Sequence, residues 1–467
     1  MNKLYGLLSK TDFKRCKQPF KYKKCLFALV WLHSILLERR KFKTLGFNIP
    51  YDFNDSDFLI CHDLTIALLD NYQESTPFKA LQYLIGEANY GGRVTDDCDR
   101  KLLSVYVGEL FREEMLNDHE YKLSSLPYYY VPKDGDYDSY INFIDHLPVI
   151  DSPSAFGQHP NASISSRVED ANSLLEMMSS IGYDKTLVKK CDDNMGVIIS
   201  KLDEVPESFN KKQIDLFKQK TTTSKNPIST FILQEIQRYN FLLISIHETK
   251  KNLLDAMKGL IILEPQLERT LETLADCKVP VSWQTYYLSM KPLDSWIRDL
   301  RERVKQLNSW IIADEPTVVW LSGFTYPSCF LTCVLQTIAR LKGCAIDSLY
   351  WEFEVMNEYE INEKREDGVY ISGLYLEGAG WDLDNGHLME PPSMTMYSQM
   401  PVILFRPTEL KKRSKEEHFQ CPLYICPLRS GTSQMSSFVM TIDLNSGSKS
   451  SEHWIKRGTA MLLSTSD

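Results

Sequence analysis

The spacing of apolar residues along this 467-residue chain changes once, and this change constrains the fold. Up to about residue 348, apolar side chains recur every three or four positions, the period of a helix that buries one face. From about residue 349 they alternate with polar residues, the period of a half-buried strand. We therefore predict an α+β protein, with helices first and an antiparallel sheet or partial barrel at the end.

The first 115 residues or so are predicted to form a small helical domain. Helices are expected over residues 20–45, 57–71, 77–87 and 96–111, with breaks at Pro50 and at the pair Gly91-Gly92. Residues 125–160 change in character. Leu126-Pro-Tyr-Tyr-Tyr-Val-Pro132 is stiff and extended, and Asp134-Gly-Asp136 signals a turn. This composition predicts a linker.

A second helical region follows. Ser166 and Glu169 fit a capping box, which predicts that a helix begins there with Val168, Ala171, Leu175 and Met178 on one face. The longest helix signal runs over residues 230–260. Its heptad-like stripe permits a coiled coil, but Phe241, Leu242 and Leu254 widen the stripe and favour a helix buried in a bundle. Strands are expected over residues 369–376, 401–405, 419–425 and 437–444.

Charge is distributed unevenly along the sequence. The net charge is −9, which argues against a polycationic nucleic-acid binder. Residues 1–45 nevertheless hold twelve Lys and Arg against Asp12 and Glu38, a net +10 that leaves −19 for the rest. The longest apolar run, residues 25–37, is shorter than the ~20 residues of a membrane span, so a buried helix is favoured. No secretory signal is recognisable, and eleven scattered cysteines indicate free thiols in a reducing compartment.

Signatures of autonomous chemistry are weak. The sequence contains no Gly-x4-Gly-Lys-Ser/Thr phosphate loop. The glycines of Asn89-Tyr-Gly-Gly-Arg93 fit a tight turn or close helix packing better than an anion-binding nest. The acids Asp96, Asp97 and Asp99 fit a helix N-terminus better than a Mg²⁺ site.

Metal and nucleophile patterns are incomplete too. His418, Cys421 and Cys426 are spaced so that the two thiols of a strand would point to opposite faces. Ser322 and Ser433 lack a full nucleophile elbow, and Cys329, Cys333 and Cys344 fit core packing. We therefore predict no catalytic, cofactor-binding or metal-ligating residue.

Several runs resemble one family, the dynein heavy chains. In the first third these are Glu38-Arg-Arg-Lys-Phe42, Phe47-Asn-Ile-Pro-Tyr-Asp-Phe-Asn-Asp-Ser-Asp57, Glu87-Ala-Asn-Tyr-Gly-Gly-Arg-Val-Thr-Asp-Asp97 and, as in axonemal members, Phe156-Gly-Gln-His-Pro-Asn-Ala162. Later runs are Pro280-Val-Ser-Trp283, Lys291-Pro-Leu-Asp-Ser-Trp296, Trp320-Leu-Ser-Gly-Phe324, Gly373-Leu-Tyr-Leu-Glu-Gly-Ala379, Cys421-Pro-Leu-Tyr424 and His453-Trp-Ile-Lys-Arg-Gly458. Cys98 departs from the pattern, since the family commonly has Trp there.

The resemblance implies the domain organisation. Residues 1–130 would be the helical lid of the sixth AAA+ module and residues 131–160 a linker. Residues 161–348 would be the helical part of the dynein C-terminal domain, and residues 349–467 its β-rich part. The basic surface of the first helical stretch would face the rest of the ring.

The resemblance also implies a function. The protein would be the C-terminal portion of an axonemal dynein heavy chain, which forms a structural and regulatory cap on the AAA+ ring of a minus-end-directed microtubule motor for ciliary movement. ATP and Mg²⁺ would act in other modules of the parent motor, so this portion alone would hold no cofactor. Its partners would be the rest of the ring and, through the parent complex, intermediate, light intermediate and light chains and microtubules. We expect no nucleic acid or membrane partner, and a location in the cytoskeleton of the ciliary axoneme.

Two other interpretations remain open at this point. The protein could be a stand-alone interaction protein that binds acidic partners through residues 1–45. It could also be an independent enzyme, such as a thiol hydrolase or a zinc protein.

Overall fold

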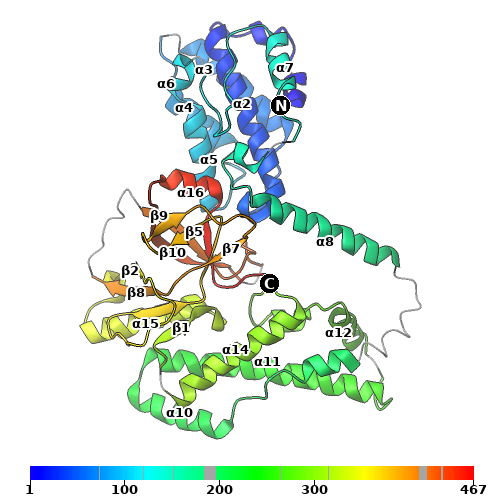
Figure 1. Ribbon diagram of the computed structural model, residues 1–467, viewed down its shortest axis with the longest axis vertical. Helices are drawn as coiled ribbons and strands as arrows, with labels where there is room; N and C mark the ends of the chain where they lie inside the picture. Colours follow the sequence, from blue (N-terminus) through cyan, green and yellow to red (C-terminus); the bar gives the residue numbers. More distant parts are fainter. Residues whose placement is uncertain are drawn as a thin grey trace.

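The computed structural model describes residues 1–466 except 73, 119, 151, 183–195, 263, 314, 410–417, 433 and 434. It confirms the α+β class, with helices first and most strands late in the sequence. Figure 1 shows three layers along the longest axis: an N-terminal helical domain, the β-sheets, and a second group of helices. The β-sheets are late in sequence but lie in the middle. We call residues 1–150 the lid and residues 162–466 the C-terminal domain.

The lid is built around one apolar helix. Nearly all of α2 (Pro19–Arg39) from Cys25 to Leu36 is buried, as the apolar run predicts, and α3 (Asp55–Asn71) packs along it. In the part of the protein that the structure describes, no helix is long and apolar enough to cross a bilayer. The other elements of the lid are α1 (Asn2–Gly6), η1 (Asp12–Lys14), η2 (Arg40–Leu45), α4 (Phe78–Gln82), η3 (Tyr83–Asn89), α5 (Asp97–Leu110) and α6 (Glu113–Asn117).

The predicted linker over residues 131–160 is not a loose connection. It contains helix α7 (Tyr137–Asp145), and Tyr140 and Ile144 are buried in the core of the lid. Tyr140 and Ile144 are four positions apart and so share one helical face. This spacing indicates a helix, but the stiff, turn-rich residues on either side favoured the prediction of a linker. Residues 152–161, with the short helix η4 (Pro153–Phe156), then lead to the C-terminal domain.

The next helix begins earlier than its capping signal predicted. Helix α8 spans Ala162–Gly182, so Ser166 lies inside the helix and does not cap it. Its predicted apolar face is solvent-exposed: Val168 is 47%, Leu175 60% and Met178 61% exposed. Figure 1 shows α8 as an arm that leaves the junction of lid and sheets and projects away from them.

The remaining helices form a bundle beneath the sheets. Residues 196–202 are helical, and α10 (Lys211–Ser224), α11 (Pro227–Met257), α12 (Pro265–Ala275), α13 (Val281–Gln284), α14 (Leu293–Ile312) and α15 (Pro327–Lys342) follow. Helix α11 packs against α10, α12, α14 and α15, which favours the bundle over the coiled coil. Leu242 is buried as expected, whereas Phe241 is exposed, so the buried stripe is narrower on that side than predicted.

Three sheets make up the β-rich part. Strands β1 (Val318–Trp320), β3 (Val369–Ser372), β8 (Ile403–Thr408) and β2 (Tyr350–Val355) form one sheet in that order. A second has the order β10 (Phe438–Asn445), β9 (His418–Tyr424), β11 (Ala460–Leu462), β4 (Tyr375–Glu377) and β7 (Tyr397–Gln399). Strands β5 (Gly380–Asp382) and β6 (His387–Met389) form a two-stranded sheet.

Most strand pairs are antiparallel, as predicted, but β1 pairs with β3 and β11 pairs with β9 in parallel. Several strands were not predicted from the sequence. Five of these have only three residues each, which is too short for an alternating apolar pattern to be recognised.

A buried ion pair lies on α14 in the helical bundle. Arg303 donates from Nε to Asp299 at 2.6 Å, and both side chains are 2% exposed. Lys291 lies 3.1 Å from the other carboxylate oxygen. Burial alone would raise the pKa of Asp299, but the charges of Arg303 and Lys291 outweigh burial and hold this pKa below its usual value.

Removing the carboxylate should destabilise the C-terminal domain. We expect Asp299→Asn to lower its free energy of unfolding by about 3–5 kcal/mol, because Arg303 then remains buried without a counter-charge. The matched control is Glu204→Gln, which breaks the exposed pair with Arg301 on the same helix and should change stability by less than about 1 kcal/mol. Urea denaturation measures both, and equal effects would contradict the expectation.

Candidate interface between lid and C-terminal domain

A buried arginine of the lid joins the two domains. Arg39, at the last turn of α2, is 0% exposed and has no carboxylate partner among the described residues. Its guanidinium instead donates to five neutral oxygens. These are the carbonyls of Gly46 (3.1 Å), Leu45 (3.0 Å), Phe156 (3.1 Å) and Lys456 (3.0 Å) and the hydroxyl of Tyr106 (2.6 Å). The lid, the connecting residues and the C-terminal domain therefore meet at one cation.

The C-terminal side of this contact is the short helix α16 (Ser451–Arg457). It ends at Gly458, whose φ of +69° is in the left-handed region that favours glycine. The lid presses against this turn, because a Cβ at Gly458 would lie 2.3 Å from the carbonyl oxygen of Leu45. Helix α16 also packs against α5 of the lid. Glycine is thus required here both by conformation and by space.

A second arginine crosses the interface from the other side. Arg429 is 5% exposed, forms a 2.6 Å ion pair with the buried Glu377, and donates to the carbonyl of Gly458 at 2.9 Å. It also donates to the side-chain oxygen of Asn48 in the lid at 3.3 Å. Burial would lower the pKa of Arg429, but the charge of Glu377 outweighs burial and raises it. The Nε of Arg429 has no hydrogen-bond partner among the described residues.

Asn48 links that arginine to the first turn of α5. Its side-chain nitrogen donates to Asp96 at 3.0 Å and to the Tyr424 hydroxyl at 2.8 Å. Asp96 is the N-cap of α5, as the acid-rich sequence predicted. Asp99 is buried and accepts from the backbone nitrogen of Asn48 and from the Tyr51 hydroxyl. Burial raises the pKa of Asp99 to about 6.

Ion pairs lie around the buried contacts of Arg39 and Arg429. Lys456 lies 2.7 Å from Glu109 of the lid. Arg457 and His453 both contact Glu390, at 3.0 and 2.7 Å. Burial would raise the pKa of Glu390, but hydrogen bonds from His453 and Arg457 lower it to about 2.

The connecting residues 152–161 run through the same interface. Gln158 is fully buried and donates to the carbonyl of Leu45 at 2.7 Å. Asn161 donates to the carbonyls of Pro392 and Thr395 at 2.7 and 2.8 Å. The connection is therefore fixed by hydrogen bonds to both domains.

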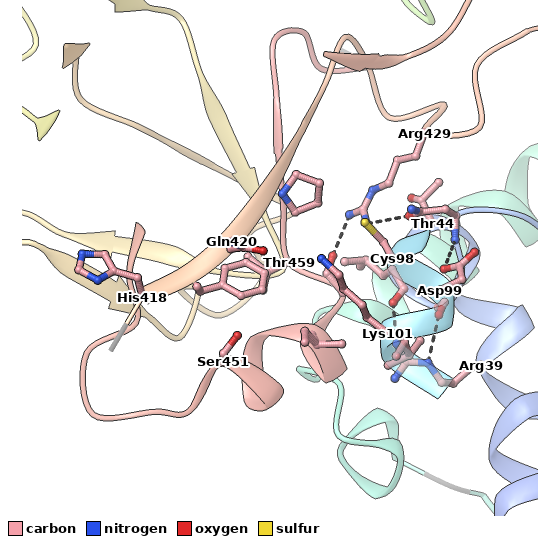
Figure 2. Close-up of a pocket in the computed structure, with 18 residues that line it drawn as sticks. Arg39, Thr44, Cys98, Asp99, Lys101, His418, Gln420, Arg429, Ser451 and Thr459 are labelled. Carbon is pink, nitrogen blue, oxygen red and sulfur yellow. Dashed lines mark hydrogen bonds between the residues drawn. The ribbon is translucent and has the colours of Figure 1, made fainter. Parts of the chain in front are cut away.

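A cavity of about 290 Å³ lies within the interface. Figure 2 shows Cys98, Asp99, Lys101 and Arg39 of the lid on one side and residues of β9 and α16 on the other. The Cys98 sulfur lies 3.6 Å from the Tyr424 hydroxyl. Cys98, one of the positions at which the resemblance is not kept, therefore borders the cavity.

The runs that resemble dynein heavy chains gather at this interface. Arg39, Asn48, Asp96, Phe156, Glu377, Tyr424 and Lys456 come from seven different runs, and each contacts another of them or a common partner. The resemblance pointed to these runs but did not reveal that they form one contact surface. The available signal was Arg39 itself, a charged residue at the end of a strongly apolar helix and followed seven residues later by Gly46.

His418, Asp96 and Asp99 lie at this interface, and the other weaker chemical candidates lie elsewhere. Gly91 is in close packing, since a Cβ there would meet the carbonyl oxygen of Gly86 at 2.3 Å, and Arg93 pairs with Asp57 at 2.9 Å. Cys421 and Cys426 are both buried, and the described residues contain no group of three metal-ligating side chains placed around one point. Cys329 is exposed, so its assignment to the core was wrong, whereas Cys333 and Cys344 are half-buried. Ser433 lies outside the described residues.

Many of the basic side chains in residues 1–45 have partners within the lid itself. Lys24 is 2% exposed and donates to the carbonyls of Leu116 and Asp118, both at 2.9 Å. Lys3, Lys10, Arg15 and Lys23 each pair with a carboxylate of the lid. A free basic arm for acidic partners is therefore not favoured.

Two family models divide the protein as the structure does. The model of the AAA lid domain of dynein heavy chains matches residues 22–162, and the model of the C-terminal domain of dynein heavy chains matches residues 168–463. The fold, the interface and these matches thus define an AAA lid joined to a dynein C-terminal domain. The chain belongs to the dynein heavy chain family.

Relatives match over almost the entire sequence. The dynein-1-beta heavy chain of the flagellar inner arm I1 complex from Chlamydomonas reinhardtii is 46% identical over 470 residues. Dynein axonemal heavy chain 2 is 44% identical in Mus musculus and 43% in Homo sapiens, over 472 residues each. Each alignment covers 99% of this chain and 10–11% of the relative, so the protein spans about a tenth of their length.

Replacing the central arginine should weaken the contact between the two domains. We expect Arg39→Met to lower the free energy of unfolding by about 3 kcal/mol, because buried carbonyl oxygens of both domains lose their donor. The neighbouring control, Arg40→Met, breaks the exposed pair with Asp52 and should cost less than about 1 kcal/mol. Urea denaturation followed by tryptophan fluorescence measures both, since Trp31 and Trp454 lie on opposite sides of the interface. An Arg39→Met protein as stable as Arg40→Met would contradict this role.

The buried carboxyl of Asp99 should make stability depend on pH. Its pKa in the folded protein is above the ~3.9 of an unfolded aspartate, so its contribution to stability is present below about pH 4 and is lost as the pH rises to about 6. We expect the difference in unfolding free energy between wild type and Asp99→Asn to fall by about 2–3 kcal/mol from pH 4 to 6. A difference that is constant, or that rises over this range, would contradict the assignment.

Proposed function

We propose that this protein is the C-terminal portion of an axonemal dynein heavy chain and acts as a structural and regulatory cap on the AAA+ ring of an ATP-driven, minus-end-directed microtubule motor for ciliary movement. The observation that carries this proposal is the interlocked lid and cap described above, matched over 99% of the chain by axonemal relatives. In this role the protein transmits forces between its two domains as one unit.

The proposal includes no ATP hydrolysis by this portion alone. The sequence has no phosphate loop, and Asp96 and Asp99, the acids considered for Mg²⁺, are engaged in a helix cap and in buried hydrogen bonds. ATP and Mg²⁺ would act in modules of the parent motor that precede the lid.

Partners and location follow from the same role. The direct partner is the rest of the motor ring, and intermediate, light intermediate and light chains and microtubules are reached through the parent complex. We place the protein in the cytoskeleton, in the axoneme of cilia. The named relatives include a component of a flagellar inner arm complex, which supports this location.

The exposed face of α8 is the surface that we assign to the ring. Val168, Leu175 and Met178 recur at helical spacing and are each about half exposed or more, on an arm that neither the lid nor the bundle covers in Figure 1. Contiguous exposed apolar residues of this kind mark protein contacts. The relatives are about ten times longer than this protein, which leaves ample additional structure to cover the face.

The test uses a chimeric motor. The matching 470-residue segment of the Chlamydomonas relative is replaced by this protein, and the purified motor is assayed for ATP hydrolysis and microtubule gliding. We expect the chimera to be active and the segment-deleted motor to be inactive or unassembled. Activity of the deleted motor equal to that of the chimera, or stoichiometric ATP turnover by the isolated 467 residues, would refute the proposal.

The chimera also tests whether the apolar face of α8 contacts the motor ring. We expect Leu175→Ser with Met178→Ser to reduce gliding and thermal stability of the motor, because the apolar face loses its contact, while the isolated protein is unaffected. The control is Leu341→Ser on α15, which removes a similarly exposed leucine outside this face. Equal behaviour of the α8 and α15 variants would remove α8 from the ring contact.

A further inference from the structure

A second cavity at the interface is lined by cations. It has a volume of about 320 Å³ and lies between the end of α5, residues 121–125, residues 155–157 and helix α16. Arg112 and Lys122 contribute from the lid, and Lys456 and Arg457 contribute from α16. Glu109 is the single carboxylate in the lining. The cavity is separate from the one that contains Cys98, since the two share no lining residue.

The positive charge of this cavity is not neutralised by the described residues. Lys456 is paired with Glu109, and Arg457 is paired with Glu390, which lies outside the lining. Arg112 and Lys122 have no carboxylate within 4.0 Å among the residues that the structure describes. Two cations thus remain in excess after both ion pairs are counted.

Some hydrogen-bond donors of the lining are used within the protein or are inaccessible, and others are left for a ligand. The Nε of Arg457 is buried and has no hydrogen-bond partner in the described part of the structure, and its side chain is only 15% exposed. This nitrogen is closed to water-sized molecules, so a ligand in the cavity does not contact it. Tyr121 and Ser125 donate to the backbone carbonyls of Glu109 and Ser154, and Arg112 donates from Nε to the carbonyl of Glu109 at 3.1 Å. Arg457 donates from its two terminal nitrogens to the carbonyl of Gly157 and to Glu390. Among the described residues, the terminal nitrogens of Arg112 and the ammonium of Lys122 are the cationic donors left for a ligand.

We propose that this cavity binds a small phosphate-bearing anion that bridges the lid and α16. Guanidinium groups bind phosphate oxygens in a planar, bidentate manner, and Lys adds a compact charge. A volume of about 320 Å³ exceeds a single phosphate and is near the lower end of small-molecule sites. Pyrophosphate and small phosphate monoesters are the class that matches both size and charge.

The bound anion would act on the interface itself. It would neutralise Arg112 and Lys122 of the lid and lie beside Lys456 and Arg457 of α16, so binding would tighten the contact between the two domains. This inference is independent of the proposed motor function, because it concerns binding by the isolated protein.

The test is titration of the purified 467-residue protein with pyrophosphate and with inorganic phosphate, followed by calorimetry and thermal unfolding. We expect saturable binding, a rise in Tm, and weaker binding at high salt, because the contacts are electrostatic. Citrate, an anion of similar charge without phosphate, should bind at least roughly tenfold more weakly. Equal affinity for citrate, or no saturable binding at pyrophosphate concentrations up to about 10 mM, would overturn the proposal.

Charge-matched variants assign the site. Arg112→Gln with Lys122→Gln should weaken pyrophosphate binding roughly tenfold or more, since two charged donors are lost. Neither residue belongs to the Arg39 or Arg429 contacts, so folding should be retained. The control, Arg298→Gln with Lys305→Gln on α14, removes the same net charge at a distant groove and should leave binding unchanged. Equal losses in both double variants would show a general charge effect and refute the site.

Discussion

The structure depends on a buried arginine that is held by neutral oxygens. A cation inside a protein is normally compensated by a carboxylate, because removal from water is strongly unfavourable. Arg39 is compensated by four carbonyls and a hydroxyl, which come from the segment after α2, from α5, from the connecting residues and from α16. If any one of these segments moved away, the buried charge of Arg39 would lose one of its hydrogen-bond acceptors. The lid and the C-terminal domain are therefore linked by a requirement of solvation as well as by apolar packing.

This requirement explains why the β-rich part lies between the two groups of helices. Arg39 holds α16, and α16 leads through Gly458 directly into β11, which pairs with β4 and β9 at the centre of a sheet. Arg429 and Glu377 then join that sheet to Asn48 and to the start of α5. Helix α16, late in the sequence, thus packs against the helices of the lid.

Local features were predictable from the sequence and long-range ones were not. The helices of the lid and four strand regions appeared in apolar periodicity, because that signal depends only on neighbouring residues. Three-residue strands, the parallel pairs and the placement of α7 on the lid depend on contacts between distant segments. The interface was visible only as a set of family-like runs, and neither the meeting of Arg39 with Lys456, 417 residues apart, nor the two cavities had a local signature.

Native-state hydrogen exchange tests the central claim most directly. In the wild-type protein, the amides of α16 and those at the ends of α2 and α5 would be followed at increasing urea concentrations below the unfolding transition. If Arg39 couples the domains, these amides open with the same free energy and the same dependence on urea, as one cooperative unit. If α16 opens at a lower free energy while α2 and α5 remain protected, the domains are independent and Arg39 does not couple them.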